Sequence, residues 1–512
     1  MDKKIISSLI GSVLIAFAFI FIAPILYAAL VMKSLYAVAI FLLPAIFTLN
    51  FGISLARFGK NHRRRLPIIE SAISMLIIYP IVALIGMMPF WWTGWLLPFD
   101  AFLETISNLT SAGLSLIPVN APYLLTLWQS LLMWFGSLLF LVILVTIMPT
   151  VGGCFGLTMT LQGGQLFSPL FGQMNAISQR MIKVYSLLTL ASFFLFKLAG
   201  LDVENSVLMA LRCISTGGGK FFPSSSNIYV EYAAIFSMLL ACGNFLLYYR
   251  LIQTLPPPRT GEKEKFFVRA INYVKRFRQN FIDNVKKFAS NSEVKTLAVI
   301  ILFCTSTLFW LAEFRDSELD LHENFRHALF HVVSYISTTG INLNYGDELP
   351  SDFDKFLIFF TAIIGGCMGS VTGGLKIVRV LVLLKTSAVE LKKTIHPHMM
   401  PSIRVNGSAV PPEIVGRILG FFFLSCLTLF VSSALLSCTD PSFSESVAMS
   451  AVCLTNVGIF PQIVEPHDFL ALSNVAKIFC AIICVIGRLE IFALLIIFAS
   501  ATKKSPTFKE KS

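Results

Sequence analysis

Charged residues are scarce in this chain. Asp, Glu, Lys and Arg make up only 13% of its 512 residues, whereas soluble globular domains contain about 25%. Apolar residues make up 56%, and 47 of them are phenylalanine. A water-soluble fold is therefore excluded. At about 20 apolar residues per transmembrane helix, we expect an all-α polytopic membrane protein.

The sequence also lacks the patterns of metal, redox and hydrolytic sites. Its ten cysteines lie singly in apolar stretches, without CxxC spacing, so they are interpreted as packing residues. No HExxH, GxSxG or paired-carboxylate pattern is present, and a membrane enzyme acting on lipid would need one of these. We therefore expect no enzyme activity and no tightly bound cofactor.

Ten apolar segments recur along the chain. They cover residues 5–31, 35–56, 69–92, 123–148, 182–200, 227–250, 294–315, 354–386, 411–437 and 469–500. With the amino terminus inside, 31 of the 40 Lys and Arg residues fall on the cytoplasmic side, as the positive-inside rule requires. Topology thus explains the net charge of +12, no nucleic-acid partner is expected, and both termini are predicted to be cytoplasmic.

Four outer segments share one pattern. Each begins with a helix-start signal, continues with half-apolar residues and ends in a small-polar run with glycine, before the next span starts. The four are 100–113 (DAFLETISNLTSAG), 204–217 (ENSVLMALRCISTG), 324–340 (NFRHALFHVVSYISTTG) and 440–458 (DPSFSESVAMSAVCLTNVG). The chain therefore contains a fourfold internal repeat of helix, half-helix, glycine turn and helix.

The length of these half-helices has a physical consequence. Ten helical residues rise about 15 Å, which is half the hydrocarbon core, so each half-helix enters the membrane without crossing it. Irregular backbone at that depth must be buried in protein or line a wet cavity. Four such segments around one axis would present rings of carbonyl oxygens, and the half-helix C-termini would add negative charge. This pattern predicts a site for a dehydrated monovalent cation.

One predicted span contains a second glycine-rich stretch. Within ten residues it has Gly365, Gly366, Gly369, Gly373 and Gly374. Because each glycine costs about 1 kcal/mol in a helix relative to alanine, we expect the helix to break near mid-membrane and the broken segment to line a cavity. The alternative is a glycine-rich contact between helices, in which the helix stays continuous.

These motifs resemble those of the TrkH/TrkG/KtrB/HKT superfamily of potassium transporters. The four glycine turns, IGGCMGSVTGGLKIVR at 364–379 and GRLEIFAL at 487–494 carry the likeness, which extends over nearly the whole chain and is closest to the TrkH branch. The resemblance implies four pseudo-symmetric helix–pore-loop–helix repeats around a central ion pore, plus two extra N-terminal transmembrane helices. It also implies potassium uptake across the bacterial inner (plasma) membrane.

The resemblance divides the chain into six parts. They are two N-terminal transmembrane helices (1–66), pore repeat 1 (67–150), pore repeat 2 (151–260), a basic cytoplasmic amphipathic linker (261–293), pore repeat 3 with an intramembrane gate loop at 364–376 (294–405), and pore repeat 4 with a cytoplasmic tail (406–512).

By position, the resemblance implies a K⁺ filter and a gate. The filter would be formed by Ser111, Ala112, Gly113, Ser215, Thr216, Gly217, Thr338, Thr339, Gly340, Asn456, Val457 and Gly458. Glycine at all four filter positions favours K⁺ over Na⁺, and K⁺ is expected as the transported ion at these residues only. The gate would be formed by Gly369, Ser370, Gly373, Gly374, Lys376 and Arg488.

The resemblance also implies partners. These are a second copy of the chain in a homodimer, membrane lipid, and a cytoplasmic ring of nucleotide-binding TrkA-type regulatory subunits. The basic segment 263–288 is typical of an interfacial amphipathic helix, with docking of a partner as the alternative. A cation-coupled secondary transporter, a K⁺ or Na⁺ symporter with alternating access, remains the alternative function. Four repeats that all start inside favour the channel-like pore, because inverted repeats would alternate in orientation.

Overall fold

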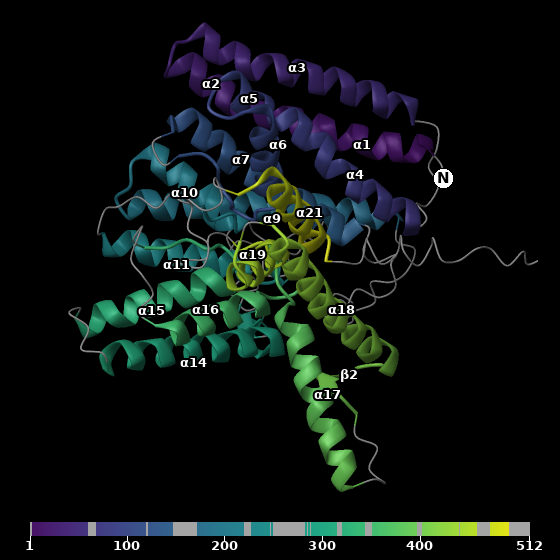
Figure 1. Cartoon of the computed structure of the whole chain (residues 1–512), viewed down its shortest axis with the longest axis vertical. Coiled ribbons are helices and arrows are strands. Elements are labelled where there is room, and N and C mark those ends of the chain that lie inside the picture. Colours follow the sequence, from purple (N-terminus) through teal and green to yellow (C-terminus); the bar gives the residue numbers. More distant parts are fainter. Residues whose placement is uncertain are drawn as a thin grey trace, which may run out of the picture.

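The structure is a computed structural model, and nearly all the elements it describes are helices (Figure 1). It describes residues 3–59, 68–118, 121–146, 171–219, 227–245, 247–248, 282–283, 285–286, 288–314, 320–343, 351–396, 402–439, 441–457 and 472–490. The described strands, β1 (Arg404–Val405) and β2 (Ser408–Ala409), form one small antiparallel hairpin. The predicted all-α class is confirmed.

An N-terminal helical pair lies at one end of the molecule (Figure 1). The first partner consists of α1 (Lys3–Ala18), η1 (Phe19–Phe21) and α2 (Ile22–Leu30) in succession, and the second is α3 (Leu35–Phe58). Glycine lets α1 and α3 approach backbone to backbone, since a Cβ on Gly11 would lie 2.5 Å from the Ala56 nitrogen and 2.7 Å from the Gly52 oxygen. Small residues at such contacts are typical of helix pairs inside membranes.

Four units of similar make-up follow, each with a short helix between longer ones. The first has α4 (Ile68–Gly86), α5 (Met88–Trp92), α6 (Pro98–Leu109) and α7 (Tyr123–Thr146); the second has α9 (Phe171–Leu198), α10 (Val203–Ser215) and α11 (Ile228–Cys242). The third has α14 (Ser292–Phe314), α15 (Leu321–Ile336), α16 (Asp352–Ile364) and α17 (Ile377–Ile395); the fourth has α18 (Pro412–Ser437), α19 (Phe443–Thr455) and α21 (Asn474–Arg488). We call α6, α10, α15 and α19 the half-helices.

The half-helices begin with matched electrostatics and are too short to cross a bilayer. Each has an acidic residue in its first turn: Asp100, Glu204, Glu323 and Glu445. A carboxylate there offsets the positive end of the helix dipole. The half-helices have 12, 13, 16 and 13 residues, about 18 to 24 Å at 1.5 Å per residue. The hydrocarbon core is about 30 Å thick.

Six helices among the described residues are long and apolar enough to cross a membrane. They are Ile6–Leu30, Leu35–Phe58, Tyr123–Leu144, Gln179–Leu198, Ser292–Phe314 and Pro412–Ser437. The other four predicted spans are shorter or interrupted here. Segment 69–92 is divided between α4 and α5, α11 ends before Gly243, 354–386 is broken in two, and α21 ends at Arg488. Residues beyond 490 lie outside the described part of the chain.

The half-helices alternate with the helices that follow them around a closed ring. Going around it, α6 packs on α7, α7 on α10, α10 on α11, α11 on α15, α15 on α16, α16 on α19, α19 on α21, and α21 returns to α6. The longer helices α9, α14 and α18 pack on the half-helix of their own unit. In Figure 1 the C-terminal α19 and α21 accordingly lie between the first and third units. The fold thus brings the ends of all four half-helices to one place.

Candidate ion pathway

Each half-helix ends in the same backbone turn. One residue at that end has a positive φ: Ser111 (59°), Thr216 (54°), Thr338 (55°) and Asn456 (51°). Positive φ is uncommon for residues other than glycine. The next N–H donates to the carbonyl five residues back: Ala112 to Ser107, Gly217 to Arg212, Thr339 to Ser334 and Val457 to Val452. This is the hydrogen bond of a Schellman motif at a helix C-terminus. The backbone therefore leaves all four half-helices with the same geometry.

This geometry corrects the register in the second unit. Ser111 lies two residues before Gly113, and Thr338 lies two residues before Gly340. By the same rule, the glycine equivalent to them in the second unit is Gly218, whereas the sequence pattern selected Gly217. Three successive glycines at 217–219 left that register ambiguous. The two residues that precede this glycine in the second segment are then Thr216 and Gly217, in place of Ser215 and Thr216.

Of the twelve predicted filter residues, the eleven that the structure describes are buried; Gly458 lies outside the described residues. The backbones of the second and third segments approach closely, since a Cβ on Gly218 would lie 1.8 Å from the Thr339 oxygen. A side chain cannot fit at that position, and this independently supports the corrected register.

Side chains join two further pairs of neighbours in the ring. Ser137 Oγ lies 2.7 Å from Ser111 Oγ and donates to the Ser215 carbonyl at 2.6 Å, which connects the first unit to the second. The Asn456 amide is oriented so that its nitrogen faces an acceptor and its oxygen faces a donor. In this orientation it donates to the Thr110 carbonyl at 3.3 Å and accepts from the Arg488 backbone N–H at 3.0 Å. The fourth unit is thereby connected to the first.

The predicted helix break is present at the glycine-rich stretch, so the continuous-helix alternative is wrong. Helix α16 ends at Ile364 and α17 begins at Ile377. Gly365, Gly369 and Gly374 have φ of 71°, 78° and 74°, which glycine adopts without strain. We call residues 365–376 the intramembrane loop.

The intramembrane loop contacts three of the four turns directly. The Gly373 N–H donates to Thr338 Oγ1 at 2.9 Å, and Thr216 Oγ1 donates to the Val371 carbonyl at 3.5 Å. A Cβ on Gly373 would lie 1.8 Å from the Thr455 oxygen. The loop therefore lies against the C-terminal ends of the half-helices, with no room for larger residues.

Two buried cations bond to this loop: Lys376, its last residue, and Arg488 of α21. Lys376 Nζ donates to the Thr372 carbonyl, to Thr372 Oγ1 at 3.0 Å and to Ser370 Oγ at 3.4 Å. Arg488 donates to the Val371 carbonyl at 2.9 Å, and its guanidinium lies 4.5 Å from the centre of the Phe140 ring. The predicted gate residues thus come together, although Lys376 is 112 residues from Arg488 in the sequence.

Glu490 makes a separate contact. It forms a buried ion pair with Arg379, whose guanidinium also lies 4.2 Å from the centre of the Phe421 ring. This pair anchors the start of α17 beside the end of α21. Glu490 therefore leaves Arg488 free to bond to the loop.

The sequence reasoning missed a buried polar network on α6, α7 and α10. Glu104 accepts from the Leu116 N–H at 2.6 Å and from Gln129 Nε2 at 2.8 Å, and Arg212 donates to Gln129 Oε1 at 2.7 Å. Arg212 also reaches the Gly218 carbonyl at 3.5 Å. Glu104 and Arg212 could have been found as ionisable residues in half-apolar helices, since such residues are rare inside membranes and face the protein interior.

Similar polar contacts occur at two further junctions of the ring. Glu231 on α11 pairs with Arg326 on α15 at 2.6 Å, and Lys477 on α21 pairs with Asp100 on α6 at 3.1 Å. Each joins the last helix of one unit to the half-helix of the next. The half-helices are thus oriented by buried polar bonds as well as by packing.

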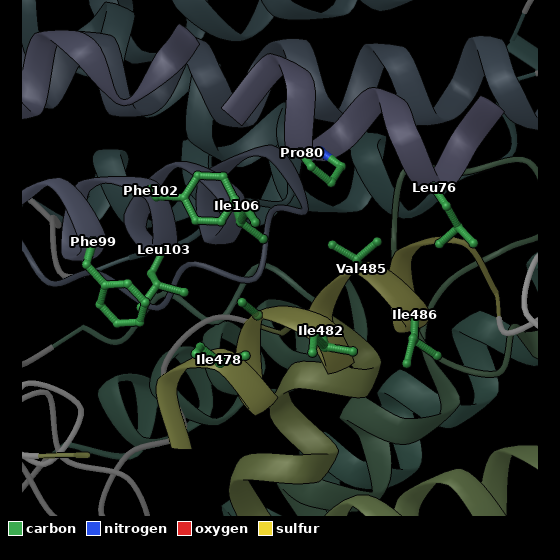
Figure 2. Close-up of a pocket in the computed structure, with 11 residues that line it drawn as sticks. Leu76, Pro80, Phe99, Phe102, Leu103, Ile106, Ile478, Ile482, Val485 and Ile486 are labelled. Carbon is green, nitrogen blue, oxygen red and sulfur yellow. The ribbon is translucent and has the colours of Figure 1, made fainter. Parts of the chain in front are cut away.

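A pocket of about 440 Å³ lies between α4, α6 and α21 (Figure 2). Figure 2 shows Phe102 and Ile106 of α6 facing Ile482 and Val485 of α21, with Pro80 of α4 beside them. Its lining side chains are all apolar, so it offers no ligand to a cation. Within the described ranges, no cluster of three or more His, Cys, Asp or Glu residues could hold a metal ion.

Comparisons with known proteins agree with this architecture. The TrkH family profile, described as a cation transport protein, matches residues 90–509. The Trk system potassium uptake protein TrkH of Halomonas elongata is 26% identical over 512 residues, which cover 98% of this chain and 99% of that protein. The protein of the same name from Escherichia coli K12 is 27% identical over 460 residues, 86% of each chain.

A solved structure shares the fold. The crystal structure of the potassium transporter TrkH from Vibrio parahaemolyticus superposes with a TM-score of 0.82 at 24% sequence identity, covering 99% of this chain and 100% of that one. The family profile extends over most of the chain and includes all four half-helices. This multi-pass membrane protein therefore belongs to the TrkH family of cation transport proteins.

Proposed function

We propose that this protein takes up potassium ions through the centre of the ring of half-helices. The observation that carries the proposal is the set of four equal left-handed turns that follow four half-helices in one closed ring. Backbone carbonyls in such a ring replace the hydration shell of a monovalent cation. The named relatives in Halomonas elongata and Escherichia coli are potassium uptake proteins.

The selectivity filter is proposed to consist of four three-residue segments. In chain order they are 111–113, 216–218, 338–340 and 456–458. The half-helices end at these segments, so the negative ends of their dipoles lie close to the ion. Dipoles and carbonyls carry partial charges, which suit a cation that must enter and leave quickly, whereas a carboxylate would hold it.

The intramembrane loop is proposed to be the gate, with Gly369, Ser370, Gly373, Gly374, Lys376 and Arg488 as its parts. Its contacts with three of the four filter turns support this role. Lys376 and Arg488 place positive charge below the filter, and a cation in a low-dielectric passage is repelled strongly by such charge. Opening then requires the bond from Arg488 to the Val371 carbonyl to break.

The regulatory and cellular setting is also proposed. A TrkA-type nucleotide-binding ring docks on the cytoplasmic face, two copies of this chain form a homodimer, and the protein lies in the bacterial inner membrane with both termini cytoplasmic. The excess of basic residues on the predicted cytoplasmic side supports an acidic partner there. Residues 263–281 of the basic segment lie outside the described residues.

Growth rescue tests the proposed uptake. A strain deficient in K⁺ uptake that expresses this chain together with a TrkA-type partner is expected to grow at limiting K⁺, and to grow poorly with the partner alone. Proteoliposomes separate the two transport mechanisms. Channel-like permeation gives Rb⁺ flux without counterflow, whereas counterflow of labelled ion would favour the alternating-access symporter. Absence of both growth and Rb⁺ flux would contradict the proposal.

A further inference from the structure

We propose that Ser137 is a positioning residue for ion selectivity, whose hydroxyl couples Arg488 and the intramembrane loop to the first two filter segments. The inference rests on the proposed function. It concerns a side chain on α7 that belongs neither to a filter segment nor to the loop.

The position of Ser137 matches that of Arg488 in the fourth unit. Ser137 follows Gly136, and a Cβ on Gly136 would lie 1.9 Å from the Leu109 oxygen at the end of α6. Arg488 follows Gly487, where a Cβ would lie 2.2 Å from the Leu454 oxygen near the end of α19. In both units a glycine allows the second helix to pack closely on the half-helix, and the side chain of the next residue contacts the turns.

All the hydrogen-bonding capacity of the Ser137 hydroxyl is used. A serine hydroxyl donates once and accepts twice. Arg488 Nη2 can only donate, and it lies 2.8 Å from Ser137 Oγ. The Ser215 carbonyl can only accept, at 2.6 Å, so it takes the Ser137 proton. Ser111 Oγ, at 2.7 Å, therefore donates to Ser137, and no lone pair is left over.

Burial makes these three bonds necessary. Ser137, Ser111 and Ser215 are each 0% exposed, so removal of the central hydroxyl leaves a carbonyl, a hydroxyl and a guanidinium N–H without this partner. Unpaired buried polar groups are costly. The backbone at the ends of α6 and α10 would therefore shift to find other partners, and the filter carbonyls that follow would shift with it.

The same hydroxyl also connects the filter to the loop. Arg488 Nη1 donates to the Val371 carbonyl of the intramembrane loop at 2.9 Å. Movement of the loop that pulls on Arg488 is transmitted through Ser137 to Ser111 and Ser215. Selectivity and gating are thus coupled at one side chain.

The test measures K⁺ and Na⁺ fluxes of the full-length purified chain in proteoliposomes. For Ser137→Ala we expect the K⁺/Na⁺ flux ratio to fall about tenfold or more, because three bonds are lost and one net hydrogen bond corresponds to roughly two- to tenfold, and partner-independent flux to rise. Ser137→Thr keeps the hydroxyl and should restore the ratio. Ser237→Ala is the matched control, because Ser237 is buried on α11 and its hydroxyl has no hydrogen-bond partner within the described structure.

Further variants separate the possible failures. If Ser137→Ala does not assemble, Ser111→Ala removes one of the three bonds and should lower the ratio by less. A folded Ser137→Ala protein with the wild-type ratio and basal flux would overturn the inference, while a changed ratio in Gly113→Ser would leave the proposed filter standing. If Gly113→Ser is also unchanged, the filter assignment itself has failed.

Discussion

Single atoms decide where glycine is required in this protein. Gly217 and Gly218 are adjacent, yet their surroundings differ. A Cβ on Gly218 would meet the Thr339 backbone oxygen at 1.8 Å, while a Cβ on Gly217 would meet the side chain of Met133, at 2.7 Å from its sulfur and 2.8 Å from its Cβ. The Met133 sulfur can move by a change of rotamer, whereas the Thr339 oxygen and the Met133 Cβ move only with their backbone. Gly218 should therefore tolerate a side chain less well than Gly217.

The first prediction compares these two glycines. Gly218→Ala is expected to lower K⁺ flux about tenfold or more, since overpacking a tight contact costs about 1–3 kcal/mol. Gly217→Ala should lower the flux by less, because the shortest contact there is with a side chain that can partly move aside. Rb⁺ uptake into proteoliposomes, at matched amounts of folded protein, is the measurement. A larger loss in Gly217→Ala than in Gly218→Ala would contradict the corrected register.

The second prediction concerns buried ion pairs. Arg326→Met leaves the Glu231 carboxylate buried without its partner, and the two side chains are only 5% and 8% exposed. Such a loss costs about 3–5 kcal/mol, so we expect a clearly lower unfolding temperature in detergent. Lys393→Met is the control, because its pair with Glu390 is exposed and is worth about 0–1 kcal/mol. Equal stability of the two variants would show that the junction between α11 and α15 does not depend on this pair.

At the scale of elements, the second helix of the third unit is interrupted, since α16 ends at Ile364 and α17 begins at Ile377. Its break lies beside the turns that end the half-helices, because Gly373 and Val371 contact those turns. The end of α11 takes part as well, since the Cys367 N–H donates to the Cys242 carbonyl and the Phe245 N–H donates to the Gly369 carbonyl. The loop is therefore bonded to its surroundings on several sides.

The third prediction tests the loop as a gate. Deletion of residues 369–373 should give K⁺ flux that no longer needs the partner, because the contacts with the filter turns are lost. Arg488→Ala should raise basal flux severalfold by removing a positive charge and the bond to Val371. Rb⁺ flux without the partner is the measurement. An assembled Arg488→Ala protein with ordinary basal flux would remove this arginine from the barrier.

At the scale of the whole molecule, charge is distributed unevenly. The net charge is +12, with 40 basic and 28 acidic residues, and most of the bases fall in the predicted cytoplasmic segments. Orientation in the membrane needs only a few bases per loop. The excess is available to an acidic partner, and attraction of this kind weakens as salt rises.

The fourth prediction follows from that excess. Changing Lys275, Arg276 and Arg278 to glutamine should weaken pull-down of a TrkA-type partner, more so at low than at high salt, because screening already weakens the attraction at high salt. The control changes three tail residues, Lys503, Lys504 and Lys509, to glutamine and removes the same charge elsewhere. If both triple variants bind the partner as well as the wild type does, the basic segment is better explained as an anchor at the lipid surface.

The sequence by itself determined the class, the repeats and the break. Composition excludes a soluble fold, glycine turns recur at matched places, and five glycines in one span predict an interruption, since hydropathy and helix propensity are local properties. The candidate gate could be predicted in part for the same reason. The family resemblance was needed to join Arg488 to a loop that lies 112 residues earlier.

Only the tertiary structure decided which groups meet. The register at 217–219 depends on a neighbouring backbone, the Thr339 oxygen, which no local pattern contains. The role of Ser137 depends on Ser111, Ser215 and Arg488, which come from three units and converge only when the ring closes. Helix formation follows from nearby residues, but hydrogen bonds between units need a fixed distance across the ring, and packing of the whole molecule sets that distance.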